Sequence, residues 1–293
     1  MAMYKGKVKK SDLVGLLVDK LTTAPVGSGE AYWKAVQSGK VDTEGYVLFS
    51  KGKSGKDKIF IRIKDDMTNG RIFMSMMEDY QPNNVVGLAG TAINESYQQH
   101  VSYYNSTYAS TMPVIYLLNF DRDKIMLVLR GDPGYSTSFP GYVLAWIGMP
   151  ERLSNEPDST AVSFAVSRYG YQLTAAGSSA GGAYATLKSL RNRRRLTQQN
   201  YSMTYVANPR TKGAGGIIST SPIYLRDGQE GGRSKLAGVL PIFQSTTLPD
   251  FKNGDEITID SKRYVIYEVG QISGASSDVN CFPSPYMAIE YLT

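Results

Sequence analysis

The sequence predicts a mainly β protein, an antiparallel sandwich or barrel with an N-terminal helical element and long loop excursions. Short runs rich in β-branched and aromatic residues recur along the chain at spacings of about 8–12 residues. Turn-forming sequences such as Asn69-Gly70 and Asn253-Gly254-Asp255 separate neighbouring runs. The 293 residues are 42% hydrophobic, which is enough to bury a sizeable core without disulfides or structural metals.

The first forty residues predict an N-terminal arm followed by helices. Residues 1–10 are basic and hold few apolar side chains, so we expect this arm to become ordered only against a neighbouring subunit. Ser11 and Asp12 are typical of a helix N-terminus, and leucines at helical spacing follow over about residues 12–23. A second, short helix is expected over residues 30–38, with Gly39 ending it.

From residue 45 onward the pattern favours strands. Tight turns are expected at Asp121-Arg122-Asp123 and at Asp260-Ser261-Lys262. The expected strands are residues 45–50, 58–64, 71–77, 113–119, 124–130, 141–147, 160–167, 238–243, 256–259, 263–269 and 286–292.

Two polar stretches, residues 81–111 and 171–220, are interpreted as long surface excursions, the second with one helix near residues 183–194. The predicted organisation has four parts. These are the N-terminal arm and helices (1–40), a β domain (41–170), a Gly/Ser/Arg-rich excursion (171–220) and a C-terminal β subdomain packed on the first (221–293).

The counts of a few residue types exclude several kinds of chemistry. Cys281 is the only cysteine and His100 the only histidine, so neither a disulfide nor a zinc cluster is expected, and no cofactor is predicted. No apolar run approaches the ~20 residues of a membrane span, and no export signal is expected at the N-terminus. The net charge of +6 permits a nucleic-acid partner without requiring one.

One motif suggests an enzyme. Residues 177–181, Gly-Ser-Ser-Ala-Gly, fit G-x-S-x-G and resemble the nucleophile elbow of the hormone-sensitive-lipase branch of α/β-hydrolases. That fold places its histidine after the serine, whereas here none follows His100, so we interpret Ser179 as part of a small-residue loop. A serine hydrolase at Ser179 stays open as an alternative, because a different fold could bring His100 to it. A glycan hydrolase is the other enzymatic alternative, but Glu78 and Asp79 would face opposite sides of a strand.

Two further motifs are interpreted as turns. Asp121 and Asp123 have the D-x-D spacing of a cation site, yet Arg122 and Lys124 alternate with them between two strands. Arg130-Gly131-Asp132 is an adhesion tripeptide, but turn-forming Pro133 and Gly134 follow it.

Two groups of side chains are candidates for an interface. Tyrosines in the first excursion offer rigid contact area with a polar group, and a basic run lies within the second excursion. We expect the basic run to meet a protein neighbour, with nucleic acid as the alternative. The candidate interface residues are Tyr97, Tyr103, Tyr104, Tyr108, Arg191, Arg193, Arg194 and Arg195.

The style of the chain is similar to that of a known class of proteins. It combines a capped N-terminal helix, the strand sequence of residues 45–50, the hairpin of residues 116–133 and the hairpin of residues 254–267, Gly-Asp-Glu-Ile-Thr-Ile-Asp-Ser-Lys-Arg-Tyr-Val-Ile-Tyr. In these features it resembles virion structural proteins of tailed bacteriophages, from the neck, tail or baseplate. The resemblance implies a non-enzymatic subunit that forms a ring or sleeve with copies of itself and contacts other virion proteins. It also implies assembly in the host cytoplasm, a final location in the virion, and no membrane.

Overall fold

The structure is a computed structural model, and it confirms a mainly β protein with antiparallel sheets and one helix near the N-terminus. Every strand pair in its described part is antiparallel. The described residues are 1–38, 45–66, 71–77, 98–102, 113–132, 143–153, 162–167, 185–189, 201–204, 219–220, 222–227, 233–243, 251–268 and 286–291.

A six-stranded sheet, here called the central sheet, forms the middle of the molecule. Its strands, in spatial order, are β1 (Ala2–Lys9), β7 (Pro113–Phe120), β8 (Lys124–Gly131), β9 (Val143–Gly148), β11 (Val162–Ser167) and β12 (Ala185–Ser189).

Two predictions fail in this sheet. The expected N-terminal arm is β1, which pairs with β7 along its whole length, so the chain itself holds it. The helix expected near residues 183–194 is wrong as well, because residues 185–189 pair with β11 as β12. In both cases pairing with an apolar neighbour outweighs a weak local preference.

Three further sheets surround the central one. The N-terminal sheet contains β2 (Lys34–Ser38), β3 (Tyr46–Ser50), β4 (Ile59–Asp66), β5 (Arg71–Met77) and β6 (Gln98–Ser102). The C-terminal sheet contains β14 (Ser219–Thr220), β17 (Val239–Phe243), β20 (Tyr286–Tyr291), β19 (Lys262–Glu268) and β18 (Glu256–Ile259). A small sheet contains β10 (Glu151–Arg152), β16 (Arg233–Lys235), β15 (Tyr224–Asp227) and β13 (Tyr201–Thr204).

The first helix was predicted within two residues, but its cap was not. α1 spans Lys10–Thr22, its N-cap is Lys9, and no side chain caps it. The hydroxyl of Ser11 bonds the carboxylate of Asp12 instead. The second predicted helix is wrong: residues 34–38 form β2, whose pairing with β3 satisfies its backbone. Strands β6, β12, β13 and β14 also fall within the two stretches predicted as loop excursions.

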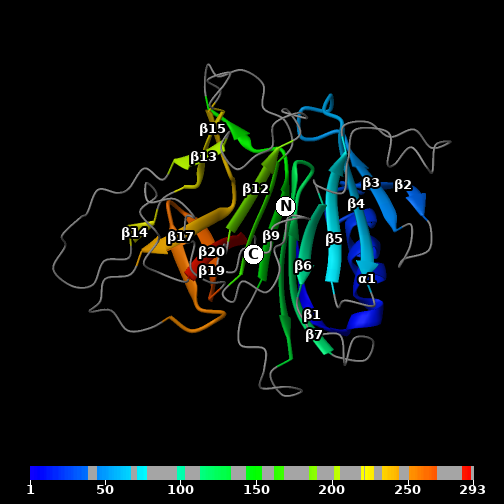
Figure 1. Cartoon of the computed structure of the whole chain (residues 1–293), viewed down its shortest axis with the longest axis horizontal. Helices are drawn as coiled ribbons and strands as arrows, with labels where there is room; N and C mark the ends of the chain where they lie inside the picture. The colour runs from blue at the N-terminus through cyan, green and yellow to red at the C-terminus, as the bar shows by residue number, and fades with distance from the viewer. Residues whose placement is uncertain are drawn as a thin grey trace.

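Both faces of the central sheet are buried, which gives the molecule three layers. Along β8, Leu127 lies in a core shared with α1 and the N-terminal sheet, whereas Val128 lies in a core shared with the C-terminal sheet. In Figure 1 the C-terminal strands stand on one side of the central sheet, and β2–β5 with α1 stand on the other. Burial on both faces explains why residues 125–129 are apolar without the alternation of a half-exposed strand.

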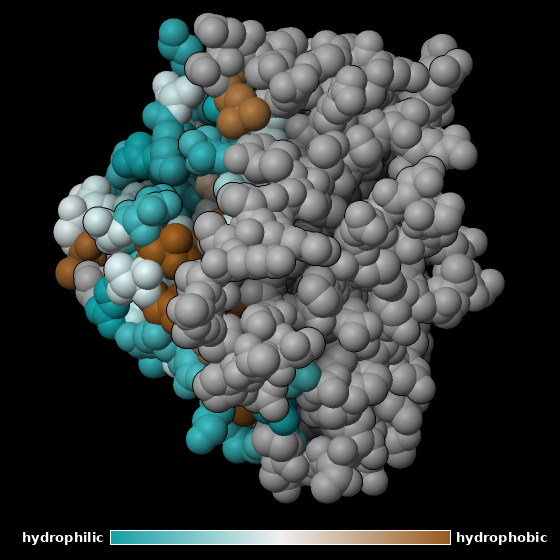
Figure 2. Space-filling view, turned by 90° about the vertical axis from the view of Figure 1, so that its left-hand side faces the viewer, coloured by the Kyte–Doolittle hydropathy of each residue, from teal (hydrophilic) through white to brown (hydrophobic). Residues whose placement is uncertain are grey.

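The described surface offers little apolar area. In the coloured part of Figure 2, hydrophilic residues predominate and the hydrophobic areas are small. Among the described residues only two large hydrophobic side chains are exposed, those of Val26 and Val36.

Candidate functional site

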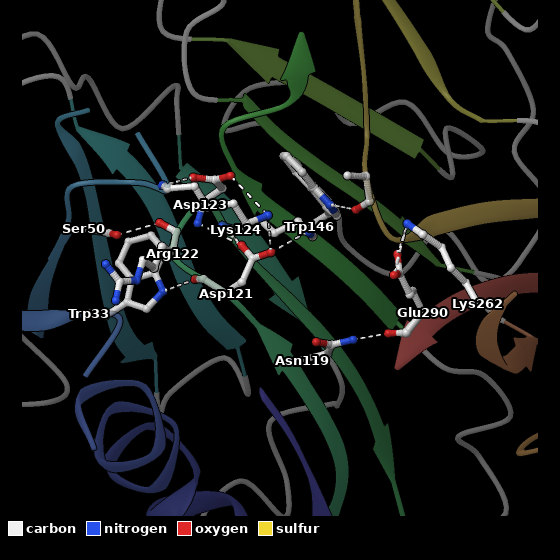
Figure 3. Close-up of polar contacts among 12 residues, drawn as sticks. Trp33, Ser50, Asn119, Asp121, Arg122, Asp123, Lys124, Trp146, Lys262 and Glu290 are labelled. Carbon is white, nitrogen blue, oxygen red and sulfur yellow. Dashed lines mark hydrogen bonds and ion pairs between the residues drawn. The ribbon is translucent and has the colours of Figure 1, made fainter. Parts of the chain in front are cut away.

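The turn between β7 and β8 is where the N-terminal sheet is fastened to the central sheet (Figure 3). The indole nitrogen of Trp33 donates to the carbonyl oxygen of Asp121 at 2.8 Å. The hydroxyl of Ser50 donates to the carbonyl oxygen of Arg122 at 2.6 Å. These bonds satisfy backbone acceptors at the tip of the turn, and they lock two segments of the N-terminal layer onto it.

The carboxylate of Asp121 is the centre of the turn. Its Oδ1 accepts the backbone N–H groups of Asp123 at 2.9 Å and Lys124 at 3.1 Å. Its Oδ2 lies 2.9 Å from the Nζ of Lys124 and 2.8 Å from the Nζ of Lys53. The side chain is only 6% exposed, so a buried charge is held by two cations and two amides.

Burial alone raises the pKa of Asp121, but Lys124 and Lys53 outweigh it and hold the pKa at about 2. For Lys53, burial lowers the pKa, but the hydrogen bonds and ion pairs with Asp121 and Asp123 raise it by more, so the pKa of Lys53 is higher than usual. Asp121 therefore stays ionised throughout the neutral range. A group that does not titrate near neutral pH suits a structural role better than proton transfer.

A lysine-rich segment joins β3 to β4 beside this turn. We call residues 51–58, Lys-Gly-Lys-Ser-Gly-Lys-Asp-Lys, the lysine loop. The backbone N–H of Lys53 donates to the Oδ1 of Asp123 at 2.6 Å, and the Nζ of Lys53 reaches Asp121. One lysine of the loop thus fastens the loop to the turn, although its side chain remains 60% exposed.

The loop also has its own internal bonds. The N–H of Asp57 donates to the carbonyl of Lys51 at 2.9 Å, and the hydroxyl of Ser54 donates to the carboxylate of Asp57 at 2.7 Å. Gly52 has φ +64°, and a Cβ there would lie 2.2 Å from the Oδ2 of Asp57. The loop is therefore closed on itself in one conformation that requires glycine at position 52.

The charged side chains of this region fall into two groups, one that forms ion pairs and one of exposed lysines. The carboxylates of Asp121 and Asp123 are paired with Lys53 and Lys124, and Glu30 pairs with Arg122 at 2.6 Å. The remaining lysines of the loop are exposed, and none forms an ion pair with a residue that the structure describes. They are Lys51, Lys56 and Lys58. The solvent-facing side of the lysine loop is therefore predominantly positive.

The other face of the central sheet is fastened in a similar way. The indole nitrogen of Trp146 donates to the carbonyl of Ala237 at 3.1 Å, and the amide nitrogen of buried Asn119 donates to the carbonyl of Glu290. Within the C-terminal sheet, the Nζ of Lys262 lies 3.2 Å from the carboxylate of Glu290, whose carbonyl Asn119 contacts (Figure 3). The two tryptophans of the chain therefore each join an outer sheet to the central one.

Most of the residues singled out from the sequence lie outside the described residues. This holds for every candidate interface residue and for the residues of the enzymatic alternatives other than His100: Tyr97, Tyr103, Tyr104, Tyr108, Arg191, Arg193, Arg194, Arg195, Ser179, Glu78 and Asp79. Cys281 lies outside them too.

Three motifs can be placed. His100 is in β6, opposite Phe73 of β5. The interpretation of Asp121 and Asp123 as a hairpin turn is confirmed. Asp132 of the adhesion tripeptide forms an ion pair with Lys7 and hydrogen-bonds Pro113 through its backbone N–H, at the end of β8. From the sequence, residues 51–57 were only the connection between the expected strands 45–50 and 58–64. Four lysines among the eight residues 51–58 were the signal that could have indicated a charged site.

Comparison with known proteins adds no family. No family model matches the chain, and no curated protein is significantly similar to it. Among the described residues, no three His, Cys, Asp or Glu side chains gather in a way that would hold a metal ion. No helix in the described part has the length and apolar character needed to cross a membrane.

Proposed function

We propose that this protein is a structural subunit of a bacteriophage particle, forming a ring or sleeve in the neck, tail or baseplate through contacts between copies of itself. The observation that carries the proposal is a rigid scaffold from which long connections leave. Buried polar side chains join the central sheet to both outer sheets, as Trp33, Asn119 and Trp146 do. Such contacts favour one fixed arrangement of the layers.

The connections support this proposal by their length and composition. Residues 78–97 join β5 to β6, and residues 269–285 join β19 to β20. Both exceed the ~12–15 residues beyond which connections are uncommon and usually functional. Long connections on a rigid scaffold are where proteins commonly place their binding residues, and Tyr97 belongs to the first of them. A closed ring gives every subunit the same neighbour, so one set of such contacts repeats around it.

The test is electron microscopy of the purified full chain, together with its mass by light scattering across a range of concentrations. We expect rings or short tubes. In the variant Arg193→Ser, Arg194→Ser, Arg195→Ser, we expect weaker assembly with little change in the melting temperature of the monomer. The control variant, Lys9→Ser, Lys34→Ser, Lys252→Ser, removes the same charge from three separate exposed sites and should assemble normally.

Two results would contradict the proposal. A monomer at every concentration, with no assembled particles, would exclude self-assembly. Stoichiometric labelling by a fluorophosphonate probe that is lost in Ser179→Ala would favour the hydrolase instead.

A further inference from the structure

We propose that the lysine loop binds the phosphate backbone of a nucleic-acid duplex. This inference is independent of the proposed function, because it concerns residues 51–58 and does not require assembly. The first step is the charge that the loop presents. Lys51, Lys56 and Lys58 are exposed, while the carboxylates nearest the turn, Asp121 and Asp123, are already paired with lysines. A ligand approaching the loop from solvent meets these three cations and the 60% exposed side chain of Lys53, against the single half-buried carboxylate of Asp57.

The second step is that the loop is organised before any ligand arrives. Its backbone bonds, the anchoring of Lys53 on Asp121 and Asp123, and the contact between Ser54 and Asp57 hold one conformation. Binding therefore loses little backbone entropy, and only the three lysine side chains need to be ordered. Gly55, with open space around the position of a Cβ, lets the backbone at the loop tip come close to a ligand.

The third step is the chemistry of the partner. Lysine is depleted in protein–protein interfaces, whose centres are formed by aromatic and apolar side chains. The lysine loop carries none of these, so it lacks the desolvated anchor that a protein partner needs. A lysine ammonium is a compact point charge that suits a phosphate well. The densest regular array of such charges is the backbone of a duplex.

The fourth step separates a duplex from a single strand. Proteins that bind single strands stack bases on aromatic side chains, and the loop has none. The loop has no Asn or Gln to read adenine and no Arg, whose planar group pairs with guanine through two hydrogen bonds; its lysines could read guanine only as point charges. We therefore infer contact with the backbone alone, independent of base sequence and steeply dependent on salt.

The experiment measures binding of the full chain to a mixed-sequence DNA duplex of about 25 base pairs by fluorescence anisotropy, over a range of salt concentrations. Each lysine that neutralises a phosphate contributes about 0.9 to the slope of log K against log salt. The variant Lys51→Ser, Lys56→Ser, Lys58→Ser should therefore lower that slope by roughly 2.7. The control Lys9→Ser, Lys34→Ser, Lys252→Ser has the same net charge and should change the slope much less.

A second variant tests the organisation of the loop. Gly52→Ala keeps every charge but places a Cβ against Asp57, so it should weaken duplex binding while circular dichroism still reports a folded protein. Several outcomes would overturn the inference: no salt-dependent binding by the wild type, equal losses in the loop and control variants, or loss only on replacing Arg193, Arg194 and Arg195. Loop-dependent binding to vesicles containing anionic lipid, with no binding to the duplex, would overturn it in favour of a membrane surface.

Discussion

Asp121 provides the sharpest test of how the layers are fastened. Its carboxylate accepts two backbone N–H groups and meets two lysine ammonium groups, almost out of contact with solvent. The substitution Asp121→Asn keeps the shape of the side chain but removes the charge. It also points an amide N–H₂ group toward donors, so contacts are lost without a cavity being created.

The magnitude follows from the pKa. The pKa of Asp121 is about 2 in the folded protein, against an ordinary value of 3.8. A difference of one pKa unit corresponds to about 1.4 kcal/mol, so the ionised carboxylate contributes about 2.5 kcal/mol to the free energy of unfolding. Because the folded pKa lies below the ordinary one, this contribution is complete above about pH 4. It is lost as the pH falls from about 4 through about 2.

The assay is urea denaturation of the wild type and Asp121→Asn at pH 7, 5, 4, 3 and 2.5. We expect the wild type to be more stable by about 2.5 kcal/mol or more at pH 7, and we expect this difference to shrink below pH 4. Asp12→Asn, which removes an exposed carboxylate from α1, controls for general effects of charge. A difference between wild type and Asp121→Asn that stays constant from pH 7 to 2.5 would refute the reasoning.

Three further predictions concern stability, each measured by urea denaturation at pH 7. Lys10 and Asp65 form a buried ion pair at 3.2 Å, so Asp65→Leu alone should cost about 3–5 kcal/mol, and the double variant with Lys10→Met should recover most of that loss. Gly148→Ala should destabilise strongly, by more than about 2 kcal/mol, because its Cβ would lie 2.1 Å from the carbonyl oxygen of Asp123, which cannot move without breaking the turn. Trp33→Phe should cost about 1–3 kcal/mol by leaving the buried carbonyl of Asp121 unpaired, Trp146→Phe should cost less because the carbonyl of Ala237 is only partly buried, and the two effects should add because they share no partner.

The strands that sequence predicts well are those whose signal is local. The hairpin of β18 and β19 combines four alternating residues, 256–259, with a turn at Asp260 and Ser261, both at positive φ. β8 was predicted from its apolar run to within one residue of its observed end. In these segments the periodicity and the turn chemistry agree with the final pairing, so no distant information is needed.

The elements that sequence misses depend on partners far away in the chain. β1 alternates lysines with small residues and glycine, and it is a strand because β7, more than a hundred residues later, offers an apolar edge. β12 contains Ala185, Leu187 and Lys188, which favour a helix, yet it completes the central sheet beside β11. Local preference is a weak term, and pairing with a strand that is already buried outweighs it.

The candidate site also has a part that the sequence predicts and a part that it does not. The turn at Asp121 and Asp123 was predicted from its position between two strands. Its partners were not, because Trp33, Ser50 and Lys53 are 88, 72 and 70 residues away from the groups that they contact. Only the fold brings these residues together. The contacts by which Lys53 fastens the lysine loop to the turn therefore cannot be predicted from the sequence.

Because Asp121 stabilises the fold and also holds a lysine of the lysine loop, Asp121→Asn should have opposite effects on stability and on duplex binding. Asp121→Asn removes the carboxylate charge that pairs with the ammonium of Lys53 at 2.8 Å, so the fold loses stability. The remaining anchors of the loop, from the N–H of Lys53 to Asp123 and from Asp57 to Lys51, do not use the carboxylate of Asp121. The loop should therefore persist, with the ammonium of Lys53 held by Asp123 alone, at 3.4 Å, and more available to a ligand beside the other three lysines.

Duplex binding should then become stronger in Asp121→Asn, with a slope of log K against log salt that is steeper by up to about 0.9. The measurement is the same anisotropy titration, carried out at pH 7 and at a temperature where circular dichroism reports a folded variant. Asp123→Ala is the matched control, because it removes one carboxylate from the same turn and with it the acceptor of the loop's backbone anchor. That variant should bind more weakly than Asp121→Asn. If both substitutions strengthen binding equally, net charge governs the interaction and the organised loop does not.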